Sequence, residues 1–177
     1  MTRSAFCRES KVMLKRFIPT GLTIVVLIAS VVLYLEYVGR SWLPPDGRLV
    51  FWYGDANGPG TSQHLLDPYS YTHFLHGVVF CWLITLAGKK LPSFWQLACV
   101  VALESTWEML ENSPMIINRY REATIALGYK GDSIVNSLSD IVVCSIGFLV
   151  AKKLGFKKSL LLFIIIEIFL LFWIRDN

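Results

Sequence analysis

The chain has 177 residues, enough for one compact domain and too few for a second. Hydrophobic residues make up 54% of the chain and charged residues only 17%, with a mean hydropathy of +0.52, whereas about a quarter of the residues are charged in soluble domains. The net charge of +4 does not indicate nucleic-acid binding, because the basic residues lie between apolar runs rather than along one stripe. The composition therefore excludes an ordinary soluble enzyme and predicts an integral membrane protein.

Five apolar runs follow one another, each near the length that spans a bilayer. The first run follows a basic tail, residues 1–18, and its exit lacks a small-residue cleavage motif, so we expect a retained signal anchor rather than a cleaved signal peptide. The predicted fold class is an all-α integral membrane protein with about five transmembrane helices in one bundle, and the single membrane domain covers residues 1–177. The five spans are expected at about 19–39, 68–88, 93–110, 133–151 and 159–174.

Basic residues are unevenly distributed between the two sides of these spans. One side holds five in the tail, two at 89–90 and four at 152–158. The other side holds two in the loop 40–67, three in the loop 111–132 and one after the last span. The positive-inside rule therefore predicts a cytoplasmic N-terminus, with both loops on the outer side.

Ionisable and polar residues recur inside the spans, where they are costly and usually face a bundle interior or a cavity. Their spacing of three or four residues keeps each set on one face of a helix. The second, third and fourth spans carry three such residues each: Tyr69, His73 and His76; Glu104, Glu108 and Glu111; Asp132, Asn136 and Asp140. Asp140 lies about 12 Å below the start of its helix, at about 1.5 Å per residue. Because successive spans run in opposite directions, we expect all three stripes to meet in the outer leaflet.

Each of these residues also has a purely structural interpretation. Asp67 and Asp132 stand where helix N-caps are expected, and Glu111 could lie at the water interface. A single histidine in a membrane span can simply hydrogen-bond to a neighbouring helix. Two histidines on one face opposite several carboxylates favour a functional site, because those carboxylates need protons, a basic partner or a metal.

The residue types suggest three roles. Two histidines with several carboxylates form a ligand set suited to Zn²⁺ or Mn²⁺, and a divalent metal is the one cofactor that the sequence suggests. The catalytic candidates are His73, His76, Glu104, Glu108 and Asp140. The metal-ligand candidates are His73, His76 and Glu108. The substrate-binding candidates are Arg119, Arg121, Asp132 and Asn136. The two arginines would hold an anionic headgroup or a phosphate, although ordinary loop charges explain them equally well.

Several polar strings resemble an uncharacterised family of small bacterial inner-membrane proteins, the DUF2585-like, UPF-type family, catalogued as a domain of unknown function. The strings are SQHLLDPY at 62–69, SYTHFLHG at 70–77, ESTWEMLEN at 104–112, RYREAT at 119–124 and YKGDSIVNSLSD at 129–140. The resemblance implies a bacterial plasma (inner) membrane location and supplies no reaction. A membrane histidine, a later glutamate and a final Asn/Asp helix are also similar to the VanZ-like antibiotic-resistance proteins.

Three functions remain open from the sequence. The first is an enzyme that acts from the periplasmic side on a lipid or lipid-linked envelope substrate. The second is a binding or transport component in which the same groups hold an ion or a proton. The third is a structural role, in which the polar residues join helices of this bundle or of a partner subunit. The lipid bilayer is the expected partner in all three.

Overall fold

The computed structural model describes residues 3–87, 91–123 and 129–174, without the side chains of 3–18 and 121–123. The described chain contains six helices joined by loops. The helices are α1 (Arg3–Tyr37), α2 (Ser70–Ala87), α3 (Ser93–Glu111), α4 (Pro114–Ala123), α5 (Ile134–Leu154) and α6 (Phe156–Trp173). Among the described residues, the one β-type pairing is an isolated bridge between Trp52 and Leu66 in the loop 40–67. The expected all-helical class is confirmed.

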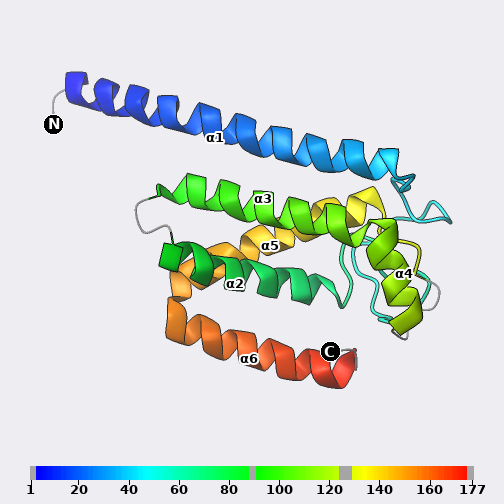
Figure 1. Ribbon diagram of the computed structural model, residues 1–177. Coiled ribbons are helices and arrows are strands. Elements are labelled where there is room, and N and C mark those ends of the chain that lie inside the picture. Colours follow the sequence, from blue (N-terminus) through cyan, green and yellow to red (C-terminus); the bar gives the residue numbers. More distant parts are fainter. Residues whose placement is uncertain (1–2, 88–90, 124–128, 175–177) are drawn as a thin grey trace.

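Five of the helices lie lengthwise beside one another and alternate in direction (Figure 1). The segment from α1 to α2, the segment from α3 to α5 with the short helix α4, and the last turn of α6 all lie at one end of the bundle, which we call the loop end (Figure 1). The turn between α5 and α6 lies at the opposite end, where Gly155 adopts a positive φ of 74°. Both predicted outer loops are therefore at the same end.

Three helices in the described ranges are long and apolar enough to cross a membrane: Pro19–Tyr37 within α1, and Ser70–Ala87 and Ile134–Leu154, which are α2 and α5. The helices α3 and α6 have 19 and 18 residues but each carries three charged residues. The apolar helices suggest a membrane protein, while the count of five spans stays a prediction. Helix α1 also continues through most of the expected tail 1–18.

Close contact between α2 and α5 depends on two glycines. A Cβ atom at Gly77 would overlap the carbonyl oxygen of Cys144, and one at Gly147 would overlap the carbonyl oxygen of Phe74. Small residues let helix backbones approach closely inside a membrane. The two glycines therefore fix the separation of the helices that carry His73 and Asp140.

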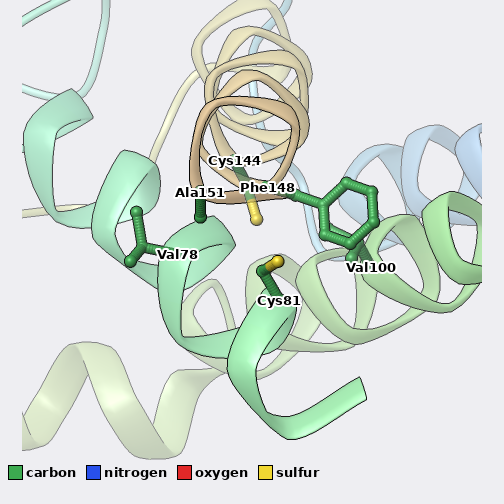
Figure 2. Packing of buried hydrophobic residues seen from close by; sticks show 6 residues of the cluster. All are labelled: Val78, Cys81, Val100, Cys144, Phe148 and Ala151. Carbon is green, nitrogen blue, oxygen red and sulfur yellow. The ribbon is translucent and has the colours of Figure 1, made fainter. Parts of the chain in front are cut away.

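An apolar core joins α2, α3 and α5, and it lies farther from the loop end than His73 and Asp140. Figure 2 shows its six residues: Val78, Cys81, Val100, Cys144, Phe148 and Ala151. A second apolar cluster packs α1 against α3 and α5 through Val31, Leu35, Val101, Ile134 and Ile141. Helix α6 is tied to α2 by the Trp82 indole, which donates a 2.9 Å hydrogen bond to Ser159 Oγ.

The starts of α2 and α5 test two expected caps. Asp67 Oδ1 accepts hydrogen bonds from the backbone N–H groups of Tyr69 (2.8 Å) and Ser70 (3.3 Å), so Asp67 caps the turn into α2 as predicted. At α5 the N-cap is Ser133, whose side chain accepts from the N–H of Asn136. The capping interpretation of Asp132 is therefore wrong, because the hydroxyl one residue later occupies that position.

The loop 40–67 fastens the first turn of α5. The N–H groups of Ser133, Ile134 and Val135 donate to loop carbonyls, those of Ser62 (2.9 Å), Ser41 (2.8 Å) and Trp42 (3.4 Å). The first N–H groups of a helix have no partner within the helix. Here the loop and the N-cap together supply acceptors for all four N–H groups from 133 to 136.

Candidate functional site

His73 lies at the centre of a buried polar cluster between α2, α3 and α5. Its Nδ1 is 2.6 Å from Glu104 Oε1, and its Nε2 is 3.8 Å from Asp140 Oδ2. The exposed fraction is 6% for His73, 0% for Glu104 and Glu108, and 3% for Asp140. We call these four residues and His76 the His73 cluster.

His76 forms the more open edge of the cluster. Its Nδ1 lies 3.2 Å from both carboxylate oxygens of Glu104, and its side chain is 30% exposed. The ring packs against Trp107, with the centroids 5.3 Å apart. The Glu104 carboxylate therefore lies between two imidazoles, one buried and one accessible.

Glu108 has a buried carboxylate with no hydrogen-bond partner on either oxygen among the described residues. Its Oε1 is 3.4 Å from His73 Nδ1, close enough for an ion pair, but that ring nitrogen already bonds Glu104 at 2.6 Å. The shorter contact makes Glu104 the hydrogen-bond partner of His73 Nδ1. Leaving a buried polar atom without a partner costs about 1–3 kcal/mol, and more when the group is charged. Glu108 thus needs a proton or a cation beside it.

Two groups of side chains within the cluster have donor atoms close enough to hold a metal ion. One is His73, His76 and Glu104, and the other is His73, Glu108 and Asp140. Within each group the ligand atoms lie within 4.8 Å of one another. The set expected from the sequence, His73, His76 and Glu108, is thereby divided between two groups that share His73.

The second group follows a common arrangement for a metal-binding histidine. Such a histidine donates its other ring N–H to a carboxylate, which fixes the tautomer and the ring orientation. With Nδ1–H donating to Glu104, the lone pair of Nε2 is on the side of Asp140. His73, Asp140 and Glu108 could therefore hold a cation, with Asp140 nearest Nε2 of the ring and Glu108 3.4 Å from Nδ1.

Asp132, an expected substrate-binding residue, instead links α3 to the start of α5. Its Oδ2 accepts from Asn112 Nδ2 and its Oδ1 from the Tyr129 hydroxyl, both at 2.7 Å. Its N–H donates to Asn112 Oδ1 at 2.8 Å. Burial raises the pKa of Asp132 above its ordinary value, and the hydrogen bonds from Tyr129 and Asn112 oppose that rise. Burial and the nearby carboxylates also raise the pKa of Tyr129.

The other three expected substrate-binding residues are Asn136, Arg119 and Arg121. Asn136 Nδ2 donates to the His64 carbonyl at 2.9 Å and so holds the loop. Arg119 is exposed on α4. Arg121 is also in α4, but its side chain lies outside the described residues. The structure brings together the five catalytic candidates, while the described contact of Asn136 is with the loop and Arg119 is exposed on α4.

Sequence reasoning gave Ser70 no role, although it is part of the site. Its hydroxyl donates to Asp140 Oδ1 at 3.2 Å and accepts from the N–H of Asp67 at 3.1 Å. Ser70 precedes His73 by three residues, the spacing that places both on one helix face. That spacing was the available signal, and serine is too common in helices for it to stand out.

Comparison with known proteins adds a family and relatives. A family model described as "Protein of unknown function (DUF2585)" matches residues 33–177, which include the whole His73 cluster. A UPF0314 protein of Rhizobium meliloti (strain 1021) is 40% identical over 151 residues, 85% of this chain and 77% of the relative. For a UPF0314 protein of Agrobacterium fabrum (strain C58) the identity is 42%, over 85% of this chain and 75% of the relative. A UPF0314 protein of Rhizobium etli (strain CIAT 652) is 43% identical, over 87% and 78%. No solved structure matches the chain.

Proposed function

The chain belongs to the DUF2585 family of proteins of unknown function, and we propose that the His73 cluster is its functional centre. In this proposal the protein is a multi-pass enzyme of the bacterial inner membrane. It acts from the periplasmic side on a lipid or lipid-linked envelope substrate, and it uses a divalent cation and acid–base chemistry.

The observation that carries this proposal is the buried carboxylate of Glu108, which lacks hydrogen-bond partners among the described residues. Three carboxylates of the cluster are buried around one buried imidazole, and both oxygens of Glu108 lack a hydrogen-bond partner in the described structure. Buried like charges raise the energy of a folded protein unless a cation or protons neutralise them. A polar group retained at such a cost inside a membrane helix usually serves a function.

The cluster offers a division of roles. His73, Glu108 and Asp140 would hold the cation, while Glu104 would orient both histidines. When bound, a divalent cation lowers the pKa of a coordinated water and polarises an ester or phosphoryl oxygen. His76 is the most accessible ionisable group of the cluster. It would take the proton from the attacking water or hydroxyl and return it to the leaving oxygen.

The periplasmic placement is supported by charge, and the bacterial membrane by the relatives. Lys152, Lys153, Lys157 and Lys158 flank the α5–α6 turn at the end opposite the loops. Lysines gather on the cytoplasmic side of membrane proteins, so the loop end would face the periplasm. The relatives named above come from bacteria of the genera Rhizobium and Agrobacterium.

Elemental analysis of the purified full-length protein tests the proposal. We expect one divalent cation per chain in the wild type and a large loss in His73→Ala and Glu108→Gln. Thr106→Ala is a matched control on α3, because the Thr106 hydroxyl is exposed and bonds only the carbonyl one turn earlier. The lipids of a deletion strain should also change. A purified protein without metal, together with unchanged lipids, would overturn the proposal.

The burial of the cluster favours a second candidate, an ion- or proton-binding membrane component. Four of its five residues are at most 6% exposed, which suits a small ion better than a large headgroup. Proton-coupled flux in liposomes that is lost in Asp140→Asn would support this alternative over the enzyme. Metal-dependent lipid turnover without flux would support the enzyme.

A further inference from the structure

An apolar groove opens at the loop end between α2, α5 and α6, with a volume of about 320 Å³. Its wall includes Trp52 from the loop, Phe74 from α2, Val143 from α5 and Ile166 from α6. Ligand pockets begin at about 300 Å³. The groove therefore has room for part of a small or elongated molecule.

Aromatic rings mark the membrane depth of this groove. Trp52, Tyr71, Phe169 and Trp173 contact one another with ring centroids 5.0–6.2 Å apart. Tryptophan and tyrosine gather at membrane–water interfaces, so this cluster places the interface near the last turns of α6. Phe74 lies three residues beyond Tyr71 along α2, about 4.5 Å deeper, and so within the hydrocarbon region.

Ser70 connects the groove with the His73 cluster. It belongs to the wall of the groove, and its hydroxyl donates to Asp140 Oδ1 at 3.2 Å. Asp140 Oδ2 is in turn 3.8 Å from His73 Nε2. One side chain thus separates an apolar surface at hydrocarbon depth from the buried polar centre.

We propose that this groove holds an acyl chain of a membrane phospholipid, with the polar end of the lipid at Ser70 beside the His73 cluster. The proposal rests on the proposed function and gives its substrate class, a molecule with a long hydrocarbon chain. Polar groups of the wall, those of Trp52, Ser70 and Tyr71, lie toward the interface, while Phe74, Val143 and Ile166 line the deeper part. The occupant must therefore be polar at the interface and hydrocarbon below it.

Other occupants fit this shape poorly. A single turn of an α-helix, about 10 Å across and about 5.4 Å long, occupies about 420 Å³, more than the groove's volume of about 320 Å³. An extended peptide would bring backbone N–H and C=O groups to hydrocarbon depth, where each needs a partner. Phe74, Val143 and Ile166 have no side-chain group that could supply one.

Photo-crosslinking of the full chain tests the proposal. The protein is placed in nanodiscs of phosphatidylethanolamine and phosphatidylglycerol, with a small fraction of phosphatidylethanolamine that carries a diazirine on one acyl chain. After illumination, mass spectrometry locates the adducts. We expect adducts enriched at Phe74, Val143 and Ile166 and reduced several-fold by Ile166→Trp, which fills the groove.

The matched control is Ile165→Trp, the neighbouring position on α6, which is 55% exposed on the outer face of the bundle. This variant should leave the groove adducts unchanged. Val143→Phe provides a second groove-filling variant if Ile166→Trp does not fold. Adducts spread evenly over the exposed faces of α1 and α6, or equally sensitive to both tryptophan variants, would overturn the proposal by showing only surrounding bilayer lipid.

Photo-crosslinking and elemental analysis together separate this inference from the proposed function. His73→Ala removes the proposed centre without touching the wall of the groove, so its adducts should match those of the wild type. If the protein holds no metal and the groove adducts persist, the enzyme proposal fails while the lipid site stands. If the metal is present and the groove is not labelled, the lipid site alone fails.

Discussion

Glu104 holds His73 in one orientation, with its Oε1 2.6 Å from His73 Nδ1. This contact leaves His73 Nε2 directed toward Asp140, at 3.8 Å from its Oδ2. The same carboxylate also lies 3.2 Å from His76 Nδ1. One glutamate therefore orients two histidines, and its removal should affect metal binding without removing a ligand of the His73–Glu108–Asp140 group.

We expect Glu104→Gln to weaken divalent-cation binding by about 10–100-fold, the usual effect of losing the hydrogen bond that orients a metal-binding histidine. Asp140→Asn, which removes a charged ligand, should weaken it further. Isothermal titration with Zn²⁺ and Mn²⁺ measures both variants against the wild type. An affinity in Glu104→Gln equal to that of the wild type would show that Glu104 does not position His73.

The contact between α2 and α5 should tolerate no added atoms at its glycines. Gly77→Ala and Gly147→Ala each place a methyl group on a backbone carbonyl of the facing helix, and overpacking of this kind costs about 1–3 kcal/mol. Thermal unfolding in detergent should therefore begin at a clearly lower temperature. Gly21→Ala is the control, since a Cβ there meets nothing within 4 Å and alanine favours a helix; its stability should be unchanged or higher.

Asp132 should make stability depend on pH. Its pKa in the folded protein is raised above the ordinary value of 3.8, so the folded state keeps a proton that the unfolded state releases. This contribution is complete below about pH 3.8 and is lost as the pH rises through the folded pKa. Thermal unfolding between pH 4 and pH 8 should show a smaller fall in Asp132→Asn than in the wild type.

Burial also raises the pKa of Asp67, so Asp132→Asn should keep part of the fall. Asp46→Asn, an exposed position, should keep the wild-type profile. Identical profiles for Asp132→Asn and the wild type would contradict the assignment to Asp132.

The hydrogen bond between Trp82 and Ser159 should hold α6 against α2. Ser159→Ala leaves the indole N–H without its acceptor, at a cost of about 1 kcal/mol. Ser145→Ala is the matched control, because the Ser145 hydroxyl bonds only the Ile141 carbonyl of its own helix. Equal unfolding temperatures for the two variants would show that this bond contributes nothing.

Spacing and helix direction predicted much of this arrangement. His73, Glu104 and Asp140 each belong to a stripe of polar residues that are three or four positions apart on their own helix. Because successive helices alternate in direction, these stripes were expected to meet. The division of the metal ligands did not follow, because the distance between His76 on α2 and Glu108 on α3 depends on how these two helices pack against each other. Rotation of one helix about its axis changes such distances without changing any sequence pattern.

Local signals also misled where two residues competed for one role. Asp132 and Ser133 are both good N-cap residues, and only the tertiary partner Asn112 decides that Asp132 faces α3. The tail 1–18 was expected only to lie on the cytoplasmic side, and no helix was predicted in it. Its basic stretch indicates a tail by composition, yet lysine and arginine are good helix formers and α1 starts at Arg3.

The hydrogen bonds from the loop 40–67 to the first turn of α5 make the geometry of the His73 cluster depend on an exposed loop. Asp140 lies two turns below Ser133 on the same helix, and a cut in the exposed stretch near Arg48 would leave the carbonyls of Ser41 and Trp42 tethered on the α1 side alone, which weakens their hold on α5. The start of α5 could then fray, and the carboxylate would lose its fixed distance to His73. Limited proteolysis at that stretch would thus disturb the geometry of the site from a distance, without changing any residue of the His73 cluster.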